Sequence, residues 1–156
     1  MPNPLDKVLE LQIQRTMNAL EANNMEAHYV ARADQVKDFV AQMIPEGATV
    51  ANGGSATLAA TGVLDLLSSG KYNFLDRRTV TGEALDKLFH DSFNADWYLA
   101  SSNAVTEKGE LFNVDGNANR VAAITFGPKN VLLIVGCNKI VPDLAAAQAR
   151  VKAIAA

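Results

Sequence analysis

The stretch VLLIV at positions 131–135 points to the fold class of this chain more directly than any other segment. It is a run of β-branched residues and leucine without a polar interruption. Such a run is typical of a strand whose two faces are both covered, as in a parallel sheet. We therefore predict a buried parallel strand over residues 131–135.

On both sides of this stretch, strand patterns alternate with helix patterns. Helices are expected over residues 5–20, 34–44, 55–67 and 81–93 and from Pro142 onward, with Asp34 and Thr81 as N-caps. Further strands are expected over residues 26–30, 48–51, 72–75 and 97–100, with 110–114 in a hairpin, whereas 121–126 fits either a helix or a strand. This alternation predicts a mostly parallel sheet with helices on both faces.

Length and composition predict one soluble globular domain over residues 1–156. Hydrophobic residues make up 49% of the chain and charged residues 20%, and the formal net charge is −3. The absence of a basic stripe argues against a nucleic-acid-binding protein. The sequence also has neither an apolar run long enough to cross a bilayer nor a secretory signal, so we predict no membrane partner and a cytoplasmic location.

The cysteine and the histidines of the chain restrict which disulfides, metal sites and catalytic triads it can form. Cys137 is the single cysteine, which excludes an internal disulfide and a cysteine-based metal site within these residues. His28 and His90 have no ligand or triad spacing around them. The residues thus predict no metal site and indicate no particular cofactor.

A polar stretch, SSNAVTEKGELFNVDGNANR at positions 101–120, follows the strand predicted at 97–100. Polar side chains gathered where a buried strand ends are typical of an α/β active site. Glu107 and Asp115 are candidates for an acid–base group, and Arg120 for a catalytic cation. The alternative is a hairpin and a turn, because Lys108-Gly109 and Asp115-Gly116 are both favourable turn dipeptides.

Two further motifs follow predicted strands. Gly53, Gly54, Ser55 and Thr57 form a loop whose glycines allow close approach to a ligand and whose hydroxyls, with the next helix N-terminus, favour an anion. The alternative is a glycine turn with Ser55 as a helix N-cap. The second motif holds Asn138 and Lys139, where Lys139 could meet an anion or could be a solvated loop lysine.

Several blocks of the sequence together resemble the LUD domain, the lactate-utilisation family. The resemblance covers nearly the whole chain, and its most specific block runs from Asn103 to Arg120. The matching blocks are Gly53–Leu58, Tyr72–Arg77, Ser102–Leu111, Asn113–Ala123, Phe126–Pro128 and Gly136–Val141.

The resemblance implies a three-layer α/β/α Rossmann-like fold, in the superfamily of sugar-phosphate isomerases and CoA-transferases. In such relatives a Gly-Ser/Thr loop holds phosphate, and Gly53, Gly54, Ser55 and Thr57 match that loop. The polar block is matched by Glu107, Asp115 and Arg120, and Asn103, Asn138 and Lys139 are counted with the ligand-binding residues. Short LUD proteins also continue into a cysteine-containing tail, which we expect beyond residue 156.

The resemblance further implies a part in the oxidation of L-lactate to pyruvate, beside partners that carry iron–sulfur clusters. Three functions stay open. The chain could be a lactate-oxidation subunit that binds a small carboxylate or phosphate-bearing ligand, and a homodimer is the assembly to expect. It could instead be an independent sugar-phosphate or acyl-CoA enzyme with a carboxylate base, or a non-catalytic sensing or assembly module.

Overall fold

The computed structural model describes residues 4–155, and its contacts divide the chain into two compact units. We call Val30–Ser101 and Asp115–Ile134 the large unit, and Met1–Tyr29, Ser102–Val114 and Val135–Ala156 the small unit. Each unit is assembled from separate chain segments. The chain is a mixed α/β protein with a mostly parallel central sheet, as predicted from the alternation of patterns.

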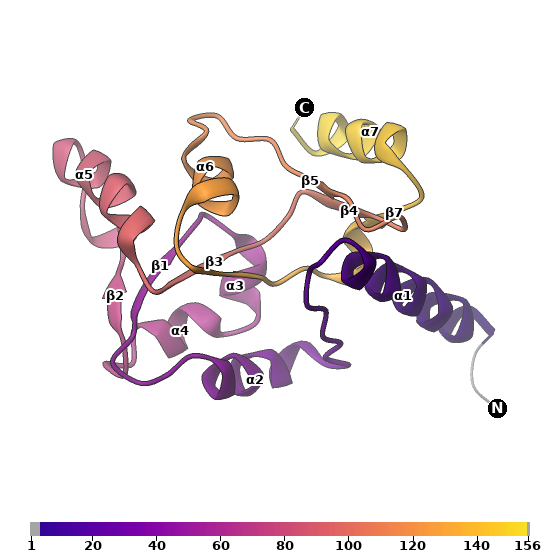
Figure 1. Cartoon of the computed structure of the whole chain (residues 1–156), viewed down its shortest axis with the longest axis horizontal. Coiled ribbons are helices and arrows are strands. Elements are labelled where there is room, and N and C mark those ends of the chain that lie inside the picture. Colours follow the sequence, from indigo (N-terminus) through magenta and orange to yellow (C-terminus); the bar gives the residue numbers. More distant parts are fainter. Residues whose placement is uncertain (1–3, 156) are drawn as a thin grey trace. The chain divides into compact units, whose positions relative to one another are not determined.

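The large unit is built on a four-stranded sheet in the order β2-β1-β3-β6, of which Figure 1 labels β1, β2 and β3. The strands are β1 (Thr49–Asn52), β2 (Asn73–Leu75), β3 (Trp97–Ala100) and β6 (Asn130–Leu133). All three pairings are parallel, and Ala51 lies opposite both Leu75 and Tyr98. The carboxyl ends of β1, β2 and β3 therefore share one edge of the sheet.

Helices cover both faces of this sheet. Successive residues of a strand point to opposite faces, so each strand contributes to two cores. Leu99 packs in a core with α2 (Val36–Met43), α3 (Ala56–Ala60) and α4 (Val63–Leu67). Its neighbours Tyr98 and Ala100 belong to a second core, which includes Ala123 of α6 (Asn119–Phe126). Figure 1 shows α2 and α4 on one side of the sheet, and α6 and α5 (Glu83–Asp91) on the other.

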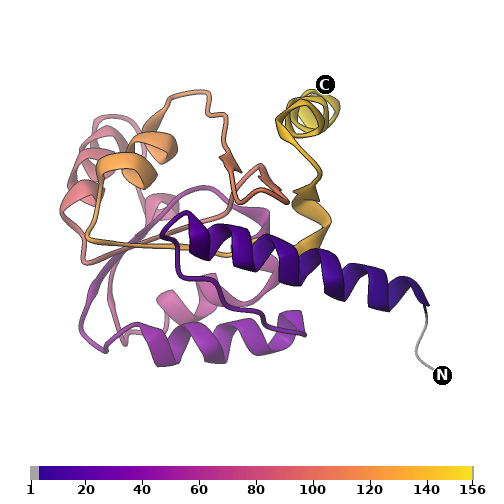
Figure 2. The same ribbon diagram turned by 45° about the vertical axis from the view of Figure 1, so that its right-hand side comes forward.

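The small unit combines two helices with a three-stranded sheet in the order β5-β4-β7. Its helices are α1 (Pro4–Ala22), whose length Figure 2 shows in indigo, and α7 (Leu144–Ala155). Strand β4 (Ala104–Thr106) pairs antiparallel with β5 (Leu111–Phe112) and parallel with β7 (Ile140–Val141). The hairpin turn needs Gly109, whose φ is +78° and whose missing Cβ would lie 2.6 Å from the Ala19 backbone.

Most predicted elements are confirmed, and three local predictions are wrong. The segment 26–30 forms no strand in the described chain, because no neighbouring strand pairs with it. Asp34 does not cap a helix, since its carboxylate accepts hydrogen bonds from Arg32 at 2.6 and 3.0 Å. Thr81 does not cap α5 either, because Gly82 occupies the N-cap position.

Other elements differ from the prediction in their bounds, and the helix expected over residues 55–67 is broken at Gly62 into α3 and α4. The last helix begins at Leu144 and not at Pro142, and the Asp143 carboxylate accepts a hydrogen bond from the Ala146 amide at its first turn. The stretch at 131–135 does form a parallel strand, β6, but at the end of the sheet order, and Val131–Leu133 is only half-buried. The ambiguous segment 121–126 is helical.

Candidate functional site

Three strands of the large unit deliver polar residues to the same sheet edge. Gly53 follows β1, Arg77 comes two residues after β2, and Ser101 follows β3. Ligands of open α/β sheets bind at such an edge, outside the carboxyl ends of the strands. This edge is therefore the candidate binding site of the large unit.

Gly53 is required there by close packing rather than by its backbone angles. A Cβ at position 53 would lie 2.9 Å from the Cδ of Arg120 and 3.0 Å from the hydroxyl of Tyr98. Neither Gly53 nor Gly54 is among the residues with positive φ. The loop thus brings the two predicted segments, 53–57 and 115–120, into contact at Gly53.

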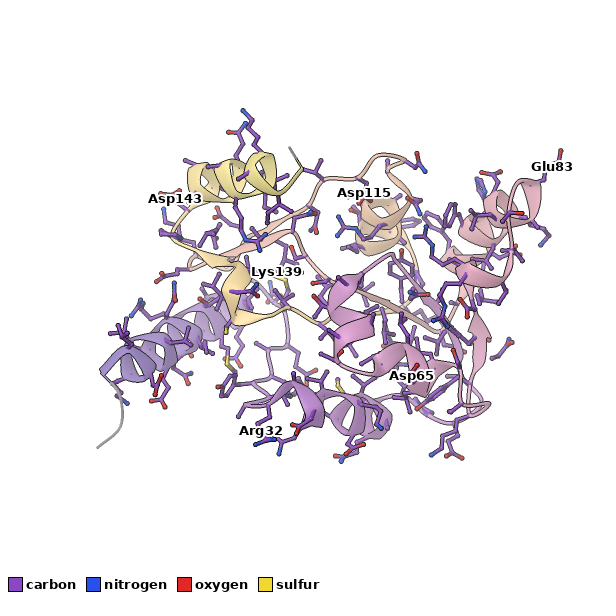
Figure 3. The ribbon with its side chains drawn as sticks, turned by 180° about the vertical axis from the view of Figure 1, so that it is seen from behind. Arg32, Asp65, Glu83, Asp115, Lys139 and Asp143 are labelled. Carbon is purple, nitrogen blue, oxygen red and sulfur yellow. The ribbon has the colours of Figure 1, made fainter. Side chains whose placement is uncertain are left out.

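Arg120 is held against this loop by a buried ion pair with Asp115. Its Nε and Nη2 lie 2.8 and 2.7 Å from Oδ1 of Asp115, and its Nη1 donates to the carbonyl of Ser101 at 2.8 Å. The other carboxylate oxygen of Asp115 accepts the Val121 amide at 2.6 Å, which satisfies an amide in the first turn of α6. Figure 3 shows Asp115 beside this helix. Both of its oxygens are therefore engaged in holding the local structure.

Ser55 and Thr57 lie at the start of α3. The Ser55 hydroxyl accepts the amide hydrogen bond of Leu58 at 3.2 Å, which is the N-cap arrangement that the alternative interpretation expects. Because α3 has only five residues, its dipole adds little to the attraction of an anion. Anion binding by this loop stays a prediction, and its electrostatic support has to come from a charged side chain.

Arg77 is a charged side chain beside this loop, and the sequence reasoning missed it. Its Nη1 lies 3.0 Å from where a Cβ on Gly54 would sit, and its guanidinium carbon is 5.3 Å from the ring centre of Phe89. The side chain is half-buried, yet no carboxylate among residues 4–155 pairs with it, whereas neighbouring Arg78 pairs with Asp76. The available signal was position, since Arg77 follows a predicted strand just as Gly53 does.

Tyr98 contributes a neutral hydroxyl at the same place. Burial raises the pKa of Tyr98 to about 12; the nearby charge of Asp115 also raises it, and those of Arg120 and Arg77 oppose the rise. The phenol therefore stays protonated and can donate a hydrogen bond at any physiological pH. At the end of β1, Oδ1 of buried Asn52 has no hydrogen-bond partner within residues 4–155, while its Nδ2 donates to the Gly53 carbonyl at 2.9 Å.

The sequence comparison identifies the family of the chain. The sequence pattern of the LUD domain matches residues 13–156. The chain belongs to the LUD domain family. No curated protein matches the sequence. Membership confirms the resemblance drawn from the motifs, and it connects this LUD domain with a family related to lactate utilisation.

The remaining predicted site residues of the LUD domain lie in the small unit. Glu107 accepts hydrogen bonds from Arg15 at 2.8 and 3.1 Å and from Gln12 at 2.9 Å, and these bonds lower the pKa of the Glu107 carboxyl. Asn103 accepts the Val114 amide at 3.0 Å, and Arg150 donates to the Asn103 carbonyl at 2.8 Å. These contacts fasten the hairpin to α1 and α7.

Asn138 and Lys139 lie in a short 3-10 helix, Cys137–Lys139, also in the small unit. Asn138 is exposed and Lys139 half-buried, and Figure 3 labels Lys139. Their predicted part in ligand binding stays a prediction. A cavity of about 230 Å³ in this unit contains none of the predicted site residues; it is lined by Glu10, Ile13, Gln14, Met17 and Tyr29.

Among residues 4–155, no helix is both long and apolar enough to span a membrane. The same part of the chain has no group of three or more histidine, cysteine or acidic side chains arranged to hold a metal ion.

Proposed function

We propose that this LUD domain binds a small anionic ligand at the carboxyl edge of its large-unit sheet, as a ligand-binding subunit in L-lactate oxidation. The observation that carries the proposal is Arg77, a half-buried guanidinium with no carboxylate partner in residues 4–155. A guanidinium withdrawn from water is unfavourable unless an anion pairs with it. The family connection with lactate utilisation supports L-lactate or pyruvate as the ligand.

The backbone beside Arg77 supports the same proposal. The amides of Gly54 and Ser55 donate no hydrogen bond within residues 4–155. Gly54 is exposed, so a ligand can reach these amides from solvent. A guanidinium next to two free amides and a protonated phenol is a suitable donor set for a carboxylate or a phosphate oxygen.

Binding is better supported than acid–base catalysis. An independent enzyme would use Glu107 or Asp115 as its base, but both carboxylates already accept hydrogen bonds from arginine side chains. Arginine pairing favours the ionised carboxylate and occupies the oxygens that would receive a substrate proton. Iron–sulfur proteins are the proposed partners of the domain, in keeping with the lactate-oxidation role.

Isothermal titration of the wild-type protein with L-lactate, pyruvate and inorganic phosphate tests the proposal. Arg77→Ala should weaken binding of the ligand that responds by about tenfold or more, because one charged hydrogen-bonding partner is lost. Arg78→Ala is the matched control, since Arg78 is adjacent, half-exposed and already paired with Asp76. Equal binding by wild type and Arg77→Ala would contradict the proposal, as would equal losses in the two variants.

A further inference from the structure

The net charge of the side chains around the Gly53–Gly54 loop limits which anions the loop can bind. Three charged side chains act on the Tyr98 hydroxyl, namely Arg77, Arg120 and Asp115. Two of them cancel, because Asp115 lies 2.7 Å from the Arg120 guanidinium in a buried pair. The site is therefore left with the single positive charge of Arg77.

The other polar groups near this loop add no charge. The pKa of Tyr98 is about 12, so the phenol is neutral, and the free amides of Gly54 and Ser55 are neutral as well. Farther along the chain, Asp76 and Arg78 form an ion pair at 2.7 Å and cancel each other. A ligand at the loop thus meets one full charge and several neutral donors.

We infer that the site is matched to a singly charged anion, a monocarboxylate or a phosphate diester, and discriminates against dianions such as phosphate monoesters. This inference rests on the proposed function. A monoanion would neutralise Arg77 completely, whereas a dianion would keep one negative charge without a counter-charge, because Arg120 is already neutralised by Asp115. Weak screening at a partly buried site makes that extra charge unfavourable.

The Gly53–Gly54 loop has the shape of a phosphate-binding loop but a smaller local positive charge. The glycine–serine loop resembles one that holds phosphate in other proteins, yet here the second guanidinium, that of Arg120, is neutralised by Asp115. Loop shape and local charge therefore favour different ligands. Because hydrogen-bonding geometry is similar for carboxylate and phosphate oxygens, the charge of the anion and not its chemical class decides which ligand binds.

Two ligand pairs at pH 8 separate charge from chemistry. Methyl phosphate, which is mostly dianionic at this pH, is compared with dimethyl phosphate, a monoanion. Tartronate, a dianion, is compared with L-lactate. Isothermal titration should give tighter binding of the monoanion in each pair, by about tenfold. Tighter binding of both dianions, still lost in Arg77→Ala, would overturn the charge inference and leave the proposed anion site standing.

Asp115→Asn tests the cancelling pair itself. The amide keeps an acceptor for the Val121 amide but frees the charge of Arg120, so the ratio of dianion to monoanion affinity should rise by about tenfold. Asp76→Asn is the control, because its partner Arg78 is half-exposed and solvent screens it, so the ratio should change little. Circular dichroism verifies folding of each variant.

A ratio unchanged in a folded Asp115→Asn protein would overturn the inference. If Asp115→Asn does not fold, the two wild-type ligand pairs still decide it. Binding of no anion at all, with Arg77→Ala indistinguishable from wild type, would overturn the proposed function and this inference together.

Discussion

Gly53 and Gly54 are adjacent in the chain, but they exclude side chains for different reasons. At Gly53 a Cβ would meet Arg120 at 2.9 Å and the Tyr98 hydroxyl at 3.0 Å, and both neighbours are fixed by burial. At Gly54 a Cβ would meet only the guanidinium end of Arg77, at 3.0 Å. A flexible side-chain end can move aside, whereas a buried pair cannot.

Gly53→Ala should therefore lower the free energy of unfolding, by about 1–3 kcal/mol, because the added methyl group overpacks a closed site. Urea denaturation measures this. Gly116→Ala is the control, since nothing lies within 4 Å of a Cβ there, and its free energy should change by less than about 0.5 kcal/mol. Gly54→Ala should instead leave stability nearly unchanged and weaken anion binding. Equal stability of the three variants would show that Gly53 is not tightly packed.

Tyr98 should make stability fall in alkaline solution. Its folded pKa of about 12 is above the ordinary value of 10, so the folded state keeps a proton that the unfolded state loses between these values. Stability from this group is complete below pH 10 and is lost as pH rises toward 12, by about 3 kcal/mol in total. Urea denaturation at pH 8, 10 and 11 measures the slope. Tyr98→Phe should remove this contribution, and an identical slope in that variant would assign it to other groups.

The start of α6 depends on one carboxylate from outside the helix. Ala118, its N-cap residue, has φ +58° and no side chain that can accept a hydrogen bond. Asp115 performs that function through Val121 and also neutralises Arg120. A single side chain therefore stabilises both the start of the helix and a buried charge.

Asp115→Ala should be strongly destabilising, by about 3–5 kcal/mol, because it leaves the buried Arg120 guanidinium without a counter-charge. Urea denaturation is the measurement. Asp76→Ala removes the carboxylate of a more exposed pair with Arg78 and should cost about 1 kcal/mol or less. Similar losses in the two variants would mean that burial does not distinguish the pairs.

The hairpin of the small unit is joined to α1 through Glu107. Arg15 and Gln12 hydrogen bonds lower the pKa of Glu107 below its ordinary 4.5, so their contribution is present above pH 4.5 and lost as pH falls through the lowered value. Glu107→Gln should cost about 1 kcal/mol or less at pH 7, since Arg15 is 59% exposed and solvent weakens the pair. The difference from wild type should shrink below pH 4.

Glu10→Gln is the control for that measurement. Glu10 pairs with Lys7 at 3.4 Å, and both side chains are more than 60% exposed. We expect no measurable change in the denaturation midpoint for this variant. A Glu107→Gln effect that stays constant between pH 7 and pH 3 would show that the ion pair is not its cause.

For the molecule as a whole, a bound anion should raise the melting temperature. The chain has a net charge of −3, so long-range attraction does not help an anion, and affinity has to come from local contacts. A ligand at a hundred times its dissociation constant stabilises the folded state by about 2.7 kcal/mol. For a chain of this size, that is a rise of roughly 5–10 °C, measurable by differential scanning fluorimetry. Arg77→Ala should show no rise at the same concentration, and an equal rise would place the ligand elsewhere.

The strand and helix pattern is the part of this protein that its sequence determined. The strand at Trp97–Ala100 was predicted with its observed bounds, and 131–135 was recognised as parallel, because alternation and apolar runs are written in consecutive residues. The segment 26–30 has a similar local pattern but forms no strand. A strand needs a partner, and a partner is not a local property.

The residues of the candidate site also divide into those that the sequence predicts and those that only the structure reveals. Motif reasoning singled out Gly53, Asp115 and Arg120, which the structure brings together, because each belongs to a dense polar or glycine-rich block near a strand end. It missed Arg77, and it treated Asp115 as a base when its oxygens hold Arg120 and the start of α6. Which carboxylate neutralises which arginine depends on side chains that meet only after distant segments pack. The sequence therefore determined most of the strands and helices, whereas only the tertiary structure decided how the strands pair and which guanidinium beside the Gly53–Gly54 loop, that of Arg77, has no carboxylate partner within residues 4–155.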